Sequence, residues 1–402
     1  MVNHRHLPNP TQELLLQAAL SDGDTACGAW REWQVRTRWE TDAIDEASLR
    51  MLPLVYSSLT RIDPLLPGLV RLKGWYRRSW LENTRLLHQT RPSIQALLDA
   101  GLRVMILKGT SLTVRYYKDR GARSMRDIDL LVPDSEAASA LEILERLGWT
   151  SNERDNAARD VLARHHGVNL AHPDGGRIDL HRRLLADSPR NADGPLWEHA
   201  VPVVLGDSHV VAPCNADELL LVCVHGWQWQ PVPSIRWIHD AVTIARHMKE
   251  DDWQRLVNEA RRRQVSLRMS LAIGVIRERF GTAVPDRVLA QLGTTPVADF
   301  EAAEERNHTS PPGLLPPGLM RAYFAHTREV GSPDGAGWWI GCARRFWFVS
   351  NAPSVRTLAP WLVRWARRRV NAGRAARQVP RSAVRTEHRA PTPAPSALQP
   401  PI

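Results

Sequence analysis

Apolar residues recur with helical spacing through the first hundred residues of the chain. Leucine-rich segments at residues 13–20, 47–59 and 69–98 place apolar side chains three and four positions apart. This spacing is the pattern of helices that bury one face. The sequence therefore predicts an N-terminal helical region over residues 1–100.

The hydrophobic period changes after residue 102. Short apolar runs bounded by turn residues indicate strands, and the amphipathic stretches between them indicate helices. Ser135 stands where a helix N-cap is expected, and Gly148 stands where that helix should end. The predicted order is a strand, a turn, a short helix, a second strand and a longer helix, at residues 103–107, 108–111, 112–118, 127–132 and 135–147.

Two pairs of alternating runs follow, and each pair predicts a hairpin. The first joins residues 167–172 to 177–182, and the second joins residues 201–205 to 209–212. Helical spacing then returns from residue 215 to residue 293. The pattern predicts an α+β fold, in which a core with a small sheet lies between helical regions. The predicted divisions are an N-terminal helical region, the core, a second helical region, Trp/Arg-rich C-terminal helices and a disordered basic Pro/Ala-rich tail, at residues 1–100, 101–213, 214–330, 331–370 and 371–402.

The formal net charge of +10 is concentrated at the C-terminal end of the chain. Residues 340–402 hold twelve arginines, no lysine and one acidic residue, a net of +11, so the rest of the chain is close to neutral. A neutral body lacks the clustered positive charge that follows a nucleic acid backbone, which argues against nucleic acid as a partner of the core. Contact of the basic tail with an anionic membrane surface stays as a weaker alternative.

The cysteines and the N-terminus indicate a cytoplasmic protein. The four cysteines are scattered and form no Cys-x-x-Cys pair, which fits a reducing compartment and gives no zinc spacing. The first residues lack an apolar signal core, and no run approaches the ~18–20 apolar residues of a membrane span.

Asp127 and Asp129 stand one residue apart at the start of the apolar run that ends at Val132. Alternate side chains of a strand point to the same face, so the two carboxylates are expected to project together. Adjacent carboxylates raise each other's pKa unless a cation lies between them. The pair therefore indicates a site for a divalent cation such as Mg²⁺, with a turn aspartate beside an unrelated neighbour as the alternative.

A third carboxylate, Asp179, lies in the second arm of the first hairpin. If this arm pairs with the strand of Asp127 and Asp129, three carboxylates converge. Such a set holds two metal ions ~3.5–4 Å apart in phosphoryl transfer. One of the carboxylates can also take the proton of an acceptor hydroxyl.

The segment Lys108-Gly109-Thr110-Ser111 separates the first core strand from a helix. Glycine lets backbone N–H groups approach a phosphate, a helix N-terminus favours negative charge, and the two hydroxyls add donors. We predict that these four residues bind nucleotide phosphates, with an ordinary helix start as the alternative. Arg123 and Arg126 flank the aspartates and either bind phosphate in a bidentate manner or neutralise the carboxylates.

Several motifs together resemble a known family. They are Leu-Lys-Gly-Thr at residues 107–110, Arg-Ser-Met-Arg-Asp-Ile-Asp-Leu-Leu-Val at 123–132, Leu-Gly-Trp at 147–149, the His pair at 165–166, Ile-Asp-Leu-His at 178–181, His225 and Arg-Trp-Ile-His-Asp at 236–240. The chain resembles the uncharacterised bacterial nucleotidyltransferase family of the polymerase-β-like superfamily through residues 45–370.

The resemblance implies a polymerase-β-like nucleotidyltransferase core with a small mixed sheet. It also implies Asp127 and Asp129 as metal ligands, Asp179 as the third catalytic carboxylate, and Gly109 with Thr110 at the triphosphate. The chain departs from the superfamily in one respect. Threonine follows the glycine where the superfamily has serine, and the spacer to the aspartates is longer.

The remaining candidates have mainly structural readings. The histidines at positions 165, 166, 172 and 181 lack zinc spacing, so we expect hydrogen-bonded structural side chains, with His181 supporting Asp179. His225 and Asp240 fall on predicted helices, where packing or hydrogen bonding between helices is expected. Residues 338–369 interleave aromatic residues with arginines, and packing against the core is expected there, with a membrane-surface helix or RNA contact as alternatives.

These features predict a metal-dependent nucleotidyltransferase. It would move a nucleoside monophosphate from an NTP such as ATP to a hydroxyl of a small-molecule, peptide or protein acceptor and release pyrophosphate. Asp127, Asp129 and Asp179 are the predicted catalytic residues and ligands of two Mg²⁺ ions, with Mn²⁺ as a substitute. The alternatives are a non-catalytic nucleotide-binding interaction protein, and a transferase that moves a phosphoryl group or a sugar from a nucleotide donor.

Overall fold

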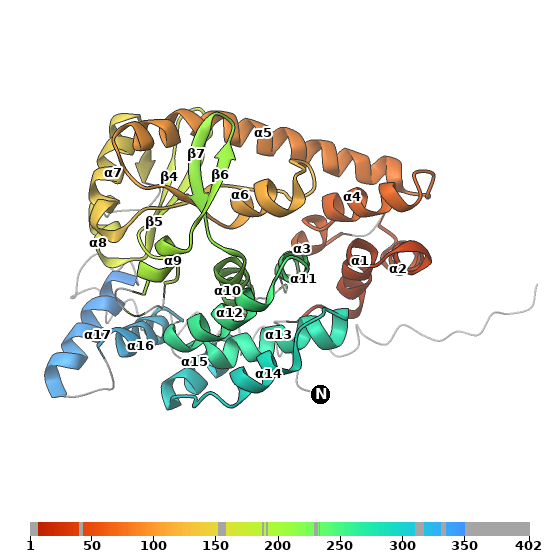
Figure 1. Cartoon of the computed structure of the whole chain (residues 1–402). Helices are drawn as coiled ribbons and strands as arrows, with labels where there is room; N and C mark the ends of the chain where they lie inside the picture. Colours follow the sequence, from red (N-terminus) through yellow and green to blue (C-terminus); the bar gives the residue numbers. More distant parts are fainter. Residues whose placement is uncertain are drawn as a thin grey trace, which may run out of the picture. The chain divides into compact units, whose positions relative to one another are not determined.

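The computed structural model describes residues 7–39, 43–151, 158–186, 189, 192–228, 232, 234–309, 317–330 and 335–349. These residues form a mixed seven-stranded sheet together with many helices (Figure 1). The predicted fold class, α+β with a mixed sheet and flanking helical regions, is confirmed.

The N-terminal region is helical, as predicted. Its first helix begins with a capping box, in which the Asn9 side chain accepts from the Gln12 backbone N–H and the Gln12 side chain accepts from the Asn9 backbone N–H. Its last helix is the longest of the described chain and contacts strands β2, β5 and β7. The helices are α1 (Pro10–Leu20), α2 (Gly23–Thr37), α3 (Glu46–Leu49), α4 (Leu52–Ile62) and α5 (Leu69–Asp99).

The strands of the core pair in the order β3-β4-β5-β2-β1-β7-β6. Strand β2 lies parallel to β5 and antiparallel to β1, whereas β1 lies parallel to β7. Both predicted hairpins are present, as β4–β5 and β6–β7. The strands are β1 (Met105–Ile106), β2 (Ile128–Leu131), β3 (Thr150–Ser151), β4 (Gly167–Ala171), β5 (Arg177–His181), β6 (Val201–Leu205) and β7 (Ser208–Ala212).

The turn predicted at residues 108–111 is wrong, because these residues are helical. Helix α6 (Lys108–Leu112) starts two residues after β1, and a π-helical segment (Thr113–Tyr117) continues it. Lys108 has a φ of +45°, a left-handed conformation that non-glycine residues seldom adopt, and the chain changes direction there. The side chains at 109–112 are buried, so tertiary packing overrides the local turn preference of Lys-Gly.

The N-cap predicted at Ser135 is also wrong. A 3-10 turn (Asp134–Glu136) leads into α7 (Ala137–Arg146), which begins without a side-chain cap. The Glu136 carboxylate instead accepts hydrogen bonds from the backbone N and the Nε of Arg103, at 2.8 and 3.2 Å. This contact joins the start of α7 to the segment before β1 and does not cap the helix. The other short helices of the core are α8 (Ala158–Arg164) and α9 (Gly194–Glu198).

The two faces of the sheet pack against different parts of the chain. On one face, Ile128 and Leu130 of β2 and their neighbours on β5 join α5, α7 and α8 in a hydrophobic cluster. On the other face, Leu131 belongs to a larger cluster that contains the N-terminal helices and α10 to α14. Since side chains alternate along a strand, Asp129 points to this second face.

The second helical region follows the sheet, as predicted. Trp338 is buried, and its ring centroid lies 5.4 Å from that of Tyr323 and 4.9 Å from that of His326. Residues 350–402, which include the predicted tail, lie outside the described part. Among the described helices, none is long and apolar enough to cross a membrane. The helices are α10 (Asn215–Gly226), α11 (Arg236–Ala245), α12 (Glu250–Arg262), α13 (Ser266–Phe280), α14 (Asp286–Gly293), α15 (Asp299–Thr309), α16 (Pro317–Val330) and α17 (Gly335–Val349).

Candidate active site

Strand register places two of the predicted carboxylates side by side. In the parallel pair β2–β5, Asp129 lies opposite Asp179. Their neighbours Ile128 and Ile178 are buried in the hydrophobic cluster on the other face. The two carboxylates therefore project from the same face of the sheet, as the sequence predicted for this pairing.

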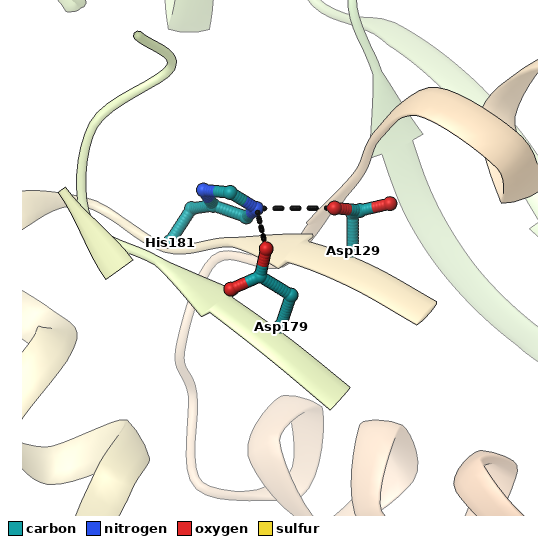
Figure 2. A group of neighbouring side chains, drawn as sticks. All are labelled: Asp129, Asp179 and His181. Carbon is teal, nitrogen blue, oxygen red and sulfur yellow. Dashed lines mark hydrogen bonds and ion pairs between the residues drawn. The ribbon is translucent and has the colours of Figure 1, made fainter. Parts of the chain in front are cut away.

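His181 and Lys108 complete a compact cluster with these carboxylates. His181 Nε2 lies 3.2 Å from Asp129 Oδ1 and 3.0 Å from Asp179 Oδ2 (Figure 2). Lys108 Nζ donates to Asp129 Oδ1 at 2.6 Å and forms a longer ion pair with Asp179 Oδ2 at 3.8 Å. The cluster thus combines side chains of β2, β5 and the first residue of α6.

The charges in this cluster stabilise one another. Burial alone would raise the pKa of Asp129, but Lys108 and His181 outweigh burial and hold that pKa well below its ordinary value. The pKa of Asp179 is lowered in the same way, with His181 as the larger cause. Burial would lower the pKa of Lys108, yet the two carboxylates raise it above its ordinary value. Both aspartates are therefore ionised at neutral pH, and Lys108 carries its proton.

Asp127 lies at the edge of the cluster, immediately before β2. It is half-buried and lines the same cavity as Asp129 and Asp179. Burial raises the pKa of Asp127, and the charges of Asp129 and Asp179 raise it further, against smaller opposing effects of Lys108 and Arg50. This carboxylate is the one with the most to gain from an added cation.

The donor atoms fit a divalent cation. One oxygen each of Asp129 and Asp179 and a ring nitrogen of His181 lie within 4.8 Å of one another, and carboxylate oxygens suit Mg²⁺ and Mn²⁺. The Lys108 ammonium is already a cation in contact with both carboxylates. His181 Nδ1 is buried without a hydrogen-bond partner among the described residues. A metal-binding histidine usually donates its other N–H to a partner, so His181 fits better as a donor to the carboxylates.

A cavity of about 360 Å³ opens over the carboxylates. This volume lies within the range of roughly 300–1,000 Å³ typical of small-ligand sites. Its wall combines the carboxylates with residues of α6, α10 and α11. Outside the carboxylates, the wall includes Lys108, Gly109, Arg50, Arg123, Arg126, His225, Arg236 and Trp237.

Of the four residues predicted to bind phosphate, Lys108 and Gly109 line this cavity. A Cβ at position 109 would lie 2.8 Å from Arg123 Nη1 and 2.9 Å from Met125 Cγ. Glycine is therefore required here by close packing on the side chains behind α6. Close packing is thus a second reason for glycine at position 109, beside the predicted approach of a phosphate.

The other two, Thr110 and Ser111, are buried away from the cavity. The Ser111 hydroxyl donates to the buried Glu218 carboxylate, and the Thr110 hydroxyl lies 3.8 Å from Met125 Sδ. Neither residue belongs to the cavity wall of the described structure. Their predicted contact with a triphosphate therefore needs either backbone N–H groups or a rearrangement of α6.

Arg123 and Arg126 have different partners. Arg123 is buried and forms a bidentate ion pair with Asp240, with Nε–Oδ1 and Nη2–Oδ2 distances of 2.9 Å. Asp240 also accepts a hydrogen bond from the Tyr117 hydroxyl at 2.6 Å. Arg126 is exposed and pairs with Glu46 of α3. Arg123 thus links α11 to the core, as expected for a helix-borne Asp240, and its guanidinium is already occupied.

Of the histidines predicted to be hydrogen-bonded, His172 and His181 have such contacts. His172 Nε2 lies 3.2 Å from the Leu147 carbonyl oxygen, and its ring lies against Trp149. His166 lies beside His181, with 5.3 Å between the ring centroids. His225 is exposed on the cavity wall, where the sequence predicted only packing or hydrogen bonding between helices.

A second, larger cavity of about 620 Å³ adjoins the first. The two cavities share Arg50, Met125 and Arg126. The wall of the second comes mainly from α3, α4 and α5, with the apolar ring of Trp75 and more arginines than acidic residues. Sequence reading did not single out Arg50, because no motif surrounds it and only the tertiary fold brings it to the carboxylates.

Comparison with known proteins identifies a family and similar solved structures. Residues 47–281, more than half of the chain, match a protein family described as an uncharacterised nucleotidyltransferase, which confirms the resemblance seen in the sequence. A solution structure of the antibiotic-resistance factor ANT(2'')-Ia is similar over 46% of this chain and 97% of that chain, with 16% identity and a TM-score of 0.34. No match was found among curated proteins.

Proposed function

The chain belongs to this uncharacterised nucleotidyltransferase family, and from that premise we propose that it transfers a nucleoside monophosphate from an NTP to an acceptor hydroxyl with release of pyrophosphate. The observation that carries the proposal is the placement of Asp129 opposite Asp179 in paired strands, beside Asp127 and under an open cavity. Nucleotidyl transfer needs clustered carboxylates to hold cations at the reacting phosphate.

Asp127, Asp129 and Asp179 would hold Mg²⁺, or Mn²⁺ in its place. The bound ions would neutralise the triphosphate and polarise the attacked phosphate. Lys108 touches two of these carboxylates, so its ammonium must leave them or be shared when a divalent cation binds. It is then free to reach a phosphate oxygen.

In the proposed reaction the acceptor oxygen attacks the α-phosphorus. A new P–O bond forms to the acceptor, the bond from the α-phosphorus to the α,β-bridging oxygen breaks, and pyrophosphate leaves. Asp179 is the proposed base for the hydroxyl proton. His181 and Lys108 hold the pKa of Asp179 low, so the carboxylate is ionised at neutral pH and has a free lone pair for the proton.

The two cavities offer separate places for the two substrates. The smaller one contains the carboxylates and fits the reacting end of the nucleotide, while the larger one fits the acceptor. The arginines of the larger cavity favour an acceptor that carries an anionic group. The acceptor could be a small molecule, or a peptide or protein segment, whose anionic group pairs with these arginines.

The test is transfer activity in Asp127→Asn, Asp129→Asn and Asp179→Asn variants. Purified protein is incubated with each of the four NTPs, Mg²⁺ and candidate acceptors, and pyrophosphate release and product mass are measured. We expect Asp129→Asn and Asp179→Asn to lose activity by at least about 100-fold, in line with the usual size of acid–base and charge effects. Asp174→Asn, in the exposed turn between β4 and β5, is the matched control and should keep full activity.

The product mass separates the proposal from its alternatives. An added nucleoside monophosphate supports it, whereas an added phosphate or hexose would indicate another transferred group. Tight NTP binding without turnover would favour a non-catalytic nucleotide-binding protein. Full activity in all three carboxylate variants would contradict the proposed site.

A further inference from the structure

We infer that Arg50 is the centre of an anion site that takes the polyphosphate chain of the nucleotide. Arg50 lies just after α3, in the N-terminal helical region, yet it lines both cavities beside Met125 and Arg126. The inference rests on the proposed function, because it assigns a binding residue for the same substrate. It adds a residue from outside the sheet that carries the carboxylates.

Arg50 is a half-buried guanidinium that makes no hydrogen bond or ion pair with another described side chain. Burial lowers the pKa of Arg50, and the nearby charges of Arg126 and Arg123 lower it further. Glu46 and Asp127 oppose this only in part. A guanidinium that is partly removed from water and surrounded by more cations than anions is unfavourable, and a bound anion would offset this cost.

The other cations of the smaller cavity are engaged elsewhere. Lys108 contacts the carboxylates, Arg123 is held by Asp240, and Arg126 pairs with Glu46. Arg236 Nη1 donates to the Ser124 carbonyl oxygen at 2.6 Å. Among the described arginines of this cavity wall, Arg50 and Arg236 thus have no carboxylate partner, and Arg50 is the one that also lines the larger cavity.

A polyphosphate fits this position better than a single carboxylate. Arg50 lies close enough to Asp127 to feel its charge, so an anion at Arg50 lies near the carboxylates where the α-phosphate must react. A chain of phosphates spans from there to the guanidinium, and guanidinium binds phosphate oxygens through two parallel hydrogen bonds.

The experiment is a titration of the full-length protein with inorganic tripolyphosphate in the presence of Mg²⁺, followed by calorimetry. Tripolyphosphate carries the charges of the nucleotide without a base, so the result does not depend on which NTP is used. Arg50→Gln should weaken binding by about tenfold or more, since hydrogen bonds between charged groups are the strong ones. Arg50→Lys should recover only part of the loss, because lysine lacks the bidentate fork.

Arg36→Gln is the matched control. Arg36 lies in the same helical region, on α2, and pairs with Glu32 on the surface, so its replacement should leave tripolyphosphate affinity unchanged. Thermal unfolding without ligand shows whether each variant is folded. The salt dependence of binding should also be shallower in Arg50→Gln than in the unmodified protein.

The possible results separate the inference from the proposed function. Unchanged tripolyphosphate affinity in a folded Arg50→Gln variant would overturn the role of Arg50 while leaving the carboxylate site intact. An equal loss in Arg36→Gln would also overturn it, because the effect would then be one of general charge. If the unmodified protein binds no tripolyphosphate, the anion site is refuted, and the pyrophosphate assay decides the transfer reaction independently.

Discussion

At the scale of single residues, the contact of Lys108 with both central carboxylates has the strongest consequence. Its ammonium lies 2.6 Å from Asp129 and 3.8 Å from Asp179, so it competes with a divalent cation for the same oxygens. Replacement of Lys108 by Met should therefore destabilise the metal-free protein by about 1–3 kcal/mol, because Asp129 and Asp179 lose the ammonium and keep only His181 as a partner. The same change should increase the affinity for Mn²⁺ and Mg²⁺.

Two measurements check this prediction. Thermal unfolding is recorded for the unmodified protein and for Lys108→Met, each with EDTA and with Mg²⁺, and Mn²⁺ binding is measured by calorimetry. Mg²⁺ should raise the melting temperature of Lys108→Met more than that of the unmodified protein. An equal rise in both would show that Lys108 does not compete with the metal. Lys73→Met, on the exposed side of α5, controls for loss of a lysine.

The residues of the site differ in how far the sequence alone could reveal them. Alternation along the strands predicts that Asp129 and Asp179 share a face, because strands have a fixed period. Asp127 lies just before β2, so this period does not fix its position. The polar contacts of Thr110 and Ser111 depend on which side of α6 faces Glu218 and Met125. The position of Arg50 depends on the packing of a distant helical region, which no local pattern records.

At the scale of elements, the contact between α10 and α11 depends on Gly226. A Cβ at this position would lie 2.1 Å from Trp237 Cγ and 2.3 Å from Trp237 Cβ, so even alanine requires the two helices to move apart. Both residues line the smaller cavity. We predict that Gly226→Ala lowers the free energy of unfolding by about 1–3 kcal/mol, as overpacking usually does.

Urea unfolding monitored by circular dichroism measures this effect. Gly274→Ala is the matched control, because Gly274 lies within α13 and a Cβ there meets nothing within 4 Å. That change should stabilise the protein by roughly 0.5–1 kcal/mol, since alanine favours a helix over glycine. Equal shifts of the same sign for both variants would contradict the close approach at Gly226.

Elements with a clear period could be predicted from the sequence, and elements set by tertiary contacts could not. The hairpins β4–β5 and β6–β7 follow from alternating residues around Gly- and Asp-containing turns. Helix α6 stands where a turn was predicted, because its burial depends on the residues that it packs against in the folded protein. In the same way, a 3-10 turn leads into α7 where the sequence predicted a cap at Ser135.

At the scale of the whole molecule, one hydrophobic cluster joins helices that precede the predicted core to helices that follow it. Trp30 and Trp33 of α2 belong to the same cluster as Leu131 of β2 and Leu256 of α12. We therefore propose that the predicted core, residues 101–213, does not fold on its own. As an isolated fragment it should lack a cooperative thermal transition, because it exposes the apolar surface that α5 and α10 cover.

Calorimetry of two truncated chains tests this proposal. A chain of residues 1–351, one compact unit in the structure, should unfold in a single transition close to that of the full chain. A fragment of residues 101–213 should show none. A stable, cooperative fragment would restore the core as an independent domain.

The order of the strands in the sheet could not be predicted from the sequence alone. Element order follows from the hydrophobic pattern, but the parallel contact of β1 with β7 joins segments about a hundred residues apart. The hydrophobic pattern of the sequence does not indicate which strand the β6–β7 hairpin pairs with. The family resemblance supplied the expectation of a small mixed sheet, and strand pairing gives its order.

The pairing register of β2 with β5 fixes which side chains face the cavity. Side chains alternate with a period of two, so a slip by one residue would turn Asp179 towards the apolar layer under α5 and bring Ile178 or Leu180 to the reactive face. No intermediate alignment exists between these two outcomes. The alignment of Asp129 with Asp179 is thus discrete. It is set by the same isoleucines and leucines that pack between the layers, and small shifts of the surrounding helices cannot alter it gradually.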